Sequence, residues 1–193
     1  VYAWELPSVM RKHIYTGAMG SVWATLIAGL FFVYFGTTVG VTEFQWSLMA
    51  GLSSWLISAQ IASAVLTERT GNRKMIWFAF AVAERSLRLV GILMALYLSL
   101  HHSRWAPVVL ITAICLANFL GTMSSPPWLS WLADIIPESE HGTFFGRRSA
   151  WMAVAVVAVV VPSGFFLDRI PEAHKLQAVT WIFVGATVIG LVD

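Results

Sequence analysis

The sequence predicts an all-α integral membrane protein. Its 193 residues are 58% hydrophobic and only 11% charged, whereas soluble domains carry about 25% charged residues. The mean hydropathy is +0.75. Six apolar segments are long enough to be membrane helices, since a helix needs about 20 residues to cross a bilayer. We therefore expect a multi-pass helical bundle in a cell membrane.

The six expected spans follow a short polar stretch. Residues 1–16 contain Arg11, Lys12 and His13. They are expected to form an amphipathic, cytoplasmic N-terminal segment that precedes the first span. The bundle is expected over residues 17–193, with spans at about 17–38, 46–66, 75–100, 107–132, 149–167 and 176–192.

Small side chains repeat at helical spacing in the first two spans. The stripe in the first span consists of Gly17, Ser21 and Thr25. The stripe in the second span consists of Gly51, Ser54, Ser58 and Ala62. Stripes of this kind let helices approach closely in lipid. The alternative interpretation is that they line a solute path.

The third span contains Glu84, Arg85 and Arg88 in its middle. A charge at this depth costs about 3 kcal/mol, so the helix cannot face lipid on all sides. Because Glu84 and Arg88 are four residues apart, they share a face and can pair. We expect the face that continues through Gly91 and Ala95 to meet other helices or a wet cavity. The three charged residues are candidates for substrate binding or coupling; the alternative is a structural ion pair.

The fourth span contains adjacent prolines, Pro126 and Pro127. Proline removes a backbone donor, so a kink or break is expected. Such a site is tolerated in a membrane only where the freed carbonyls find partners or water. Asn118, Thr122 and Ser125 share one face before the prolines, and that face either binds solute or bonds to neighbouring helices. Asn118 and Thr122 are therefore further site candidates.

The distribution of cations predicts that both termini are cytoplasmic. Cytoplasmic loops of membrane proteins are enriched in Lys and Arg. Outside the spans, seven cations fall on the N-terminal side and three on the other: Arg11, Lys12, Arg69, Arg73, Lys74, Arg147 and Arg148, against Arg104, Arg169 and Lys175. Six spans then return the chain to the side on which it starts.

Several functions are disfavoured by composition. The net charge of +2, without a basic run, argues against nucleic-acid binding. Cys115 is the only cysteine, which excludes an intrachain disulfide and a multi-cysteine metal site. No Gly-x-Ser-x-Gly string occurs, and no histidine lies in the middle of an expected span. We therefore expect no catalytic residues, no metal, no cofactor and no enzymatic activity.

The loop between the second and third spans carries a motif. Residues 64–74 read AVLTERTGNRK, which resembles the loop signature of the major facilitator superfamily. The matching positions are Leu66, Glu68, Arg69, Gly71, Arg73 and Lys74. A glycine in so short a connection allows the positive φ that a helix end often needs.

The loop between the fourth and fifth spans resembles the same loop in bacterial members of that superfamily. It contains Asp134, then Pro137 and Glu138, and it ends in Arg147 and Arg148. The resemblance implies a network of charges in which Asp134, Arg147 and Arg148 join the first loop.

The resemblance implies the N-terminal six-helix half of a transporter, built as a 3+3 inverted repeat, with substrate held between two halves. The expected function is secondary transport of a small solute by alternating access, in a bacterial inner membrane. Expected partners are the lipid bilayer, the solute and a C-terminal half that is missing from the sequence, or a second copy. The fourth span lacks the arginine of many proton-coupled members, and the antiporter motif of the fifth span is incomplete. The alternative function is a non-transporting membrane subunit or assembly factor with this fold.

Overall fold

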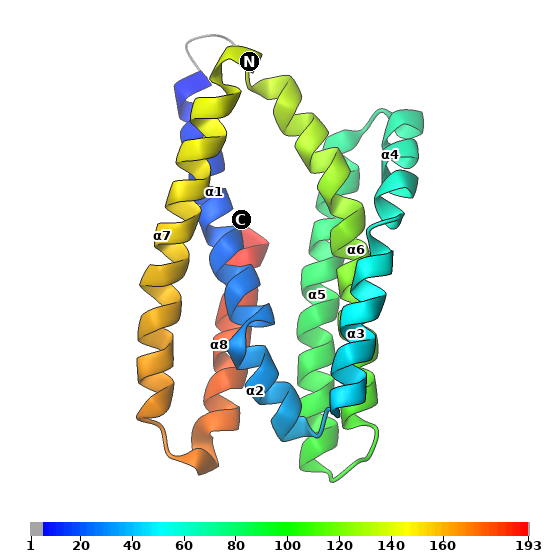
Figure 1. Ribbon diagram of the computed structural model, residues 1–193, viewed down its shortest axis with the longest axis vertical. Helices are drawn as coiled ribbons and strands as arrows, with labels where there is room; N and C mark the ends of the chain where they lie inside the picture. The colour runs from blue at the N-terminus through cyan, green and yellow to red at the C-terminus, as the bar shows by residue number, and fades with distance from the viewer. Residues whose placement is uncertain (1–5, 193) are drawn as a thin grey trace. The chain divides into compact units, whose positions relative to one another are not determined.

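The computed structural model describes residues 6–192, and over this range it consists of helices and short connections (Figure 1). The helices are α1 (Leu6–Ala28), α2 (Leu30–Val39), α3 (Glu43–Leu56), α4 (Ala59–Thr70), α5 (Arg73–Leu100), α6 (Ala106–Ile135), α7 (His141–Asp168) and α8 (Glu172–Val192). A short 3-10 helix, η1 (Glu138–Glu140), precedes α7.

Long apolar helices confirm the expected class of a multi-pass membrane protein. Within residues 6–192, five stretches are long and apolar enough to cross a bilayer: Leu6–Val39, Glu43–Thr70, Ala106–Ile135, Glu138–Asp168 and Glu172–Val192. Helix α5 has 28 residues and therefore the necessary length, but its charges make it less apolar. Residues 6–192 thus contain five to six long apolar helical stretches that are compatible with membrane spans.

Two of the expected spans are interrupted, and three helices begin earlier than expected. The first span divides into α1 and α2 at Gly29, and the second divides into α3 and α4 at Ile57 and Ser58. Helix α1 already begins at Leu6, so residues 6–16 continue the first helix; residues 1–5 lie outside the described range. Helices α7 and α8 likewise begin before their expected apolar segments.

The chain folds as two compact units. The described residues of the first unit are 6–33 and 133–192, and the second unit is Tyr34–Leu132. In the first unit α1 packs against both α7 and α8. A methyl group at Gly17 of α1 would overlap the guanidinium of Arg148, and one at Gly190 of α8 would overlap the ring of Trp23. Both glycines therefore permit close packing of a large side chain on a helix backbone.

In the second unit α5 lies directly against α6. A Cβ atom at Gly91 would collide with the side chain of Ala113, so these two positions bring the helix backbones together. Around them Ile92 and Ala95 of α5 and Leu110 of α6 are buried. Small residues at a contact allow this close approach in lipid, and the contact fixes the register of α5 on α6.

The connection from α4 to α5 turns as the sequence predicts. Gly71 ends α4 in the left-handed region, at φ 66°, and its N–H donates to the carbonyl of Thr67 at 3.0 Å. The side chain of Asn72 then accepts from the N–H of Met75 at 3.3 Å and caps α5. The expected role of Gly71 in reversing the chain is thus confirmed.

The two prolines do not break α6. The helix continues from Ala106 to Ile135 through Pro126 and Pro127, so, of the kink or break that the sequence predicts, the break is wrong. Because Pro127 has no N–H, the carbonyl of Met123 loses its usual helical donor. The hydroxyl of Ser63 on α4 donates to that carbonyl instead, at 2.5 Å. The chain thereby satisfies the freed acceptor and joins α4 to α6.

The small-residue stripe of the second expected span is not the buried face of α3 and α4. Gly51, Ser54, Ser58 and Ala62 are all exposed. Ser63 and Thr67 are buried instead. The hydroxyl of Ser53 also lies inward, where it accepts from Asn118 of α6. Polar partners on α6 therefore decide which face turns inward, because unsatisfied polar groups are costly in a membrane. The stripe on the first span differs, since Gly17 is buried.

Candidate functional site

A chain of hydrogen bonds links three helices of the second unit. Arg88 on α5 donates from Nη2 to Glu84 Oε1 at 3.1 Å and to Asn118 Oδ1 on α6 at 2.7 Å. Asn118 Nδ2 then donates to the hydroxyl of Ser53 on α3 at 3.2 Å, and Ser53 donates to the carbonyl of Met49 at 2.8 Å. The pairing of Glu84 with Arg88 is thus confirmed.

This network is buried in otherwise apolar helices. The side chain of Arg88 is 7% exposed and that of Glu84 is 14% exposed. A buried ion pair is stable only when further hydrogen bonds satisfy its remaining donors and acceptors. Asn118 supplies such an acceptor to the guanidinium, and it uses the other end of its amide to bind Ser53. The expected inward face of α5 is confirmed, since Arg88, Gly91 and Ala95 are buried.

The Glu84 carboxylate rests on the backbone of α6 at a glycine. A Cβ atom built on Gly121 would lie 2.7 Å from Glu84 Cδ and 2.8 Å from both carboxylate oxygens. No side chain larger than hydrogen therefore fits at position 121 while Glu84 keeps its place. Gly121 thus allows the carboxylate to lie beside the polar part of α6.

An open cavity of about 420 Å³ adjoins the carboxylate. Polar side chains from α3, α4, α5 and α6 face it. The lining residues are Ser53, Gln60, Glu84, Asn118, Gly121, Thr122, Ser124 and Ser125. Three of the α6 hydroxyls also donate to carbonyls of their own helix, at 2.8–3.3 Å. Their oxygens can still accept hydrogen bonds. The cavity thus presents a carboxylate, two amides and several hydroxyls to anything inside it.

Most of the expected substrate-site candidates meet at this cavity. Glu84, Asn118 and Thr122 line it, and Arg88 lies behind Glu84 and Asn118 in the hydrogen-bond network. Arg85 is half-buried on the same helix, but it is not among the residues that line the cavity.

The residues of the two loop motifs lie at helix ends. In the second unit Glu68, Arg69 and Lys74 are exposed around the turn, and Arg73, which begins α5, is half-buried. In the first unit the charge-network candidates differ in burial: Asp134 and Arg147 are exposed, and Arg148 is half-buried over Gly17.

Sequence reasoning missed four members of this cavity: Ser53, Gln60, Gly121 and Ser124. Ser53 and Gln60 lie seven residues apart in the second expected span, a spacing of two helical turns that places both on one face. That spacing is a signal that could have found them. Gly121 gives no such signal, because its role depends on the nearness of Glu84 from another helix.

No family model matches the chain, and comparison with curated proteins and with solved structures likewise gave no match.

Proposed function

We propose that this chain is the N-terminal half of a secondary transporter of the major facilitator type, and that it moves a small polar solute by alternating access. The observation that carries the proposal is the buried network of Glu84, Arg88 and Asn118, which adjoins an open polar cavity in apolar helices. Ionisable groups at membrane depth are costly and most often mark solute or ion pathways.

The loop motifs support the choice of superfamily. The segment from Glu68 to Lys74 has the acid, arginine, glycine and basic residues of the family signature, and its glycine adopts the left-handed turn. In this fold each half consists of two inverted three-helix repeats, and the substrate binds between the halves. The proposed partner is therefore a second six-helix half, and the proposed location is a bacterial inner membrane with both termini of this half in the cytoplasm.

The chemistry of the cavity points to a hydrogen-bonding solute. Glu84 accepts hydrogen bonds, while Gln60 and Asn118 carry amides that both donate and accept. The positive charge of Arg88 lies against the Glu84 carboxylate, so the pair offsets its own charge. A neutral or zwitterionic solute with several hydroxyl, amide or amine groups fits this lining better than an apolar compound does.

The test removes the pair without removing its hydrogen-bonding atoms. In the full-length protein, Glu84→Gln combined with Arg88→Gln should leave the protein folded and abolish solute uptake by proteoliposomes. The solutes to be assayed are sugars, amino acids and nucleosides that raise the melting midpoint of the unaltered protein. If the pair only holds α5 in place, the double variant will fold and transport at a near-normal rate, and the proposal fails.

A second ion pair provides the matched control. Lys175 pairs with Glu172 near the start of α8, where the Glu172 side chain is 76% exposed. Glu172→Gln with Lys175→Gln removes the same two charges away from the cavity, and uptake should persist. If no solute binds and the protein purifies in a fixed complex with another membrane protein, the chain is a non-transporting subunit instead.

A further inference from the structure

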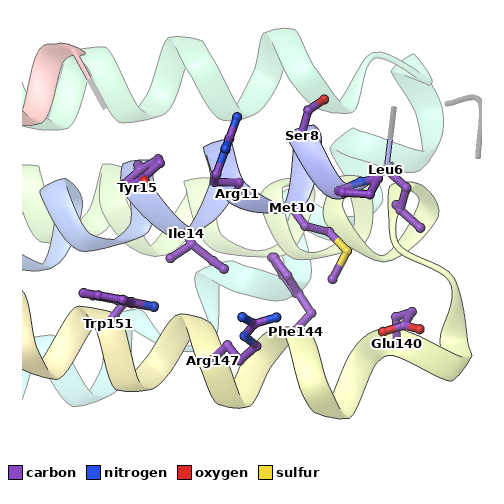
Figure 2. A pocket seen from close by; sticks show the side chains of 11 residues that line it. Leu6, Ser8, Met10, Arg11, Ile14, Tyr15, Glu140, Phe144, Arg147 and Trp151 are labelled. Carbon is purple, nitrogen blue, oxygen red and sulfur yellow. The ribbon is translucent and has the colours of Figure 1, made fainter. Parts of the chain in front are cut away.

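A second cavity lies in the first unit, between the beginning of α1 and the beginning of α7. Its volume is about 790 Å³. Met10 and Ile14 of α1 line it, together with Phe144, Arg147 and Trp151 of α7. Figure 2 shows the side chains of Met10 and Ile14 directed toward α7, and those of Phe144 and Arg147 directed toward α1. None of these residues belongs to the proposed transport site.

The charged groups that line this cavity favour an anion. Arg11 from α1 and Arg147 from α7 supply two guanidiniums, and Glu140 supplies one carboxylate. Figure 2 shows the side chain of Arg147 directed toward α1 and that of Arg11 directed away from α7. Both arginines are exposed, so Arg11 can turn on its flexible stem to reach a ligand beside Arg147. Guanidinium binds phosphate oxygens through two parallel hydrogen bonds, which makes arginine the usual side chain for phosphate recognition.

The remaining lining is apolar or aromatic. Met10, Ile14 and Phe144 form apolar walls, and Tyr15 and Trp151 border them at 63% and 57% exposure. Tyrosine and tryptophan concentrate at the membrane–water interface, because their rings are apolar and their tips are polar. A free inorganic anion would leave the apolar walls unused. An amphiphilic ligand would contact both kinds of surface.

The cavity also lies near the ends of its helices, at the level where lipid headgroups are expected. It occupies the first turns of α1 and the η1–α7 segment, which begin stretches of 34 and 31 residues that are apolar enough to span a bilayer. The ends of such helices meet the lipid headgroups, since the hydrocarbon core is only about 30 Å thick. Basic pockets between helices at this level bind acidic headgroups in other membrane proteins.

We propose that this cavity binds an anionic phospholipid, whose phosphate contacts Arg147 and draws the exposed side chain of Arg11 toward it, and whose glycerol and upper acyl chain contact Met10, Ile14 and Phe144. The proposal does not depend on the transport function.

The experiment measures lipid binding to the purified full-length protein in detergent by native mass spectrometry. The probes are dioleoyl phosphatidylglycerol and dioleoyl phosphatidylcholine, and phosphatidylglycerol should bind preferentially. Each arginine near an anionic surface contributes about fivefold in affinity, so Arg11→Gln with Arg147→Gln should weaken phosphatidylglycerol binding about 25-fold. Arg11→Lys with Arg147→Lys retains both charges and should recover most of the affinity.

The matched control removes two arginines elsewhere. Arg104 lies in the turn before α6, and Arg169 directly follows α7; both are exposed and neither lines the cavity. Arg104→Gln with Arg169→Gln should leave the affinity within about twofold, because the charge effect is local. Equal losses in the two Gln pairs, or equal binding of both lipids, would overturn the proposal. Displacement of phosphatidylglycerol by glycerol 3-phosphate or inorganic phosphate at micromolar concentration would show a soluble-anion site and overturn it as well.

Discussion

Arg88 on α5 and Asn118 on α6 are joined by a hydrogen bond of 2.7 Å, shorter than the 3.1 Å bond between Arg88 and its charged partner Glu84 on the same helix. The neutral amide therefore does more than fill space beside the ion pair. It ties the guanidinium to the neighbouring helix, and through Ser53 it extends the link to α3.

Replacing Asn118 should show how much this hydrogen-bonded link contributes to stability, apart from the packing of the helices. Asn118→Leu removes the acceptor of Arg88 and should lower stability by about 0.6 kcal/mol and at most about 1.7 kcal/mol, the mean and the maximum found for interhelical hydrogen bonds in a membrane protein. Asn118→Asp restores an acceptor and should recover part of the loss. Thermal unfolding in detergent is the measurement. Ser125→Ala is the control, because that exposed hydroxyl bonds only its own helix; an equal loss in both would contradict the assignment.

Gly121→Ala should displace the Glu84 carboxylate, since its new Cβ would lie 2.7 Å from Cδ of that side chain. We expect a lower melting midpoint and loss of uptake in the full-length protein. Gly51→Ala makes the same chemical change at a helix position with nothing within 4 Å of the new atom, and it should be neutral or slightly stabilising. Unchanged uptake in Gly121→Ala would show that the position of Glu84 is unimportant.

Ser63 and Pro127 should be energetically coupled. Ser63→Ala leaves the Met123 carbonyl without its hydroxyl donor and should cost about 1 kcal/mol. In a Pro127→Ala background the restored backbone N–H can bond that carbonyl, so Ser63→Ala should cost much less. A double-mutant cycle on unfolding free energies measures the coupling. Additive effects would mean that the serine does not compensate for the proline.

The direction of the chain in the membrane can be tested by labelling single cysteines in a Cys115→Ala background. His102 lies in the turn after α5 and Asn72 in the turn before it, and both are exposed. From the cation distribution we expect a membrane-impermeant maleimide to label a cysteine at 102, and not one at 72, in intact cells. The reverse result would invert the predicted topology.

The predicted charge network between the loops is open to a charge-reversal test. The resemblance implies at least one contact that joins the first loop region to the second, between an acid (Glu68 or Asp134) and one of the basic residues Arg69, Arg73, Arg147 and Arg148. Asp134→Lys should reduce uptake in the full-length protein, and Glu at one of those four positions should restore it. A complete scan of the four reversals without any rescue would reject a pairing that involves Asp134.

Features set by local spacing were predictable from the sequence. Glu84 and Arg88 pair because four residues make about one helical turn. Gly71 ends a helix because glycine accepts a positive φ at little cost. The long apolar helices follow from the segment lengths. Each of these features depends on residues that are close together in the chain.

Features set by the contact of two helices were not predictable. Asn118 was a candidate from its own helix face, but its bond to Arg88 joins residues 30 positions apart and depends on the packing of Gly91 on Ala113. The same packing brings Gly121 under Glu84. The Met123 carbonyl, which Pro127 leaves without a helical donor, is satisfied by Ser63, a residue 60 positions earlier in the chain. One sequence contains no direct signal for such registers.

The hydrogen bond between Arg88 and Asn118 also constrains how the protein is made. An arginine at the centre of a helix opposes entry into the bilayer by about 2.5–3.5 kcal/mol, and its acceptor on α6 is synthesised 30 residues later. At about 5–20 residues per second, α5 must wait about 2–6 s for that partner. We therefore expect α5 to remain at the insertion machinery until α6 follows, so that the two helices enter the lipid together as a hairpin.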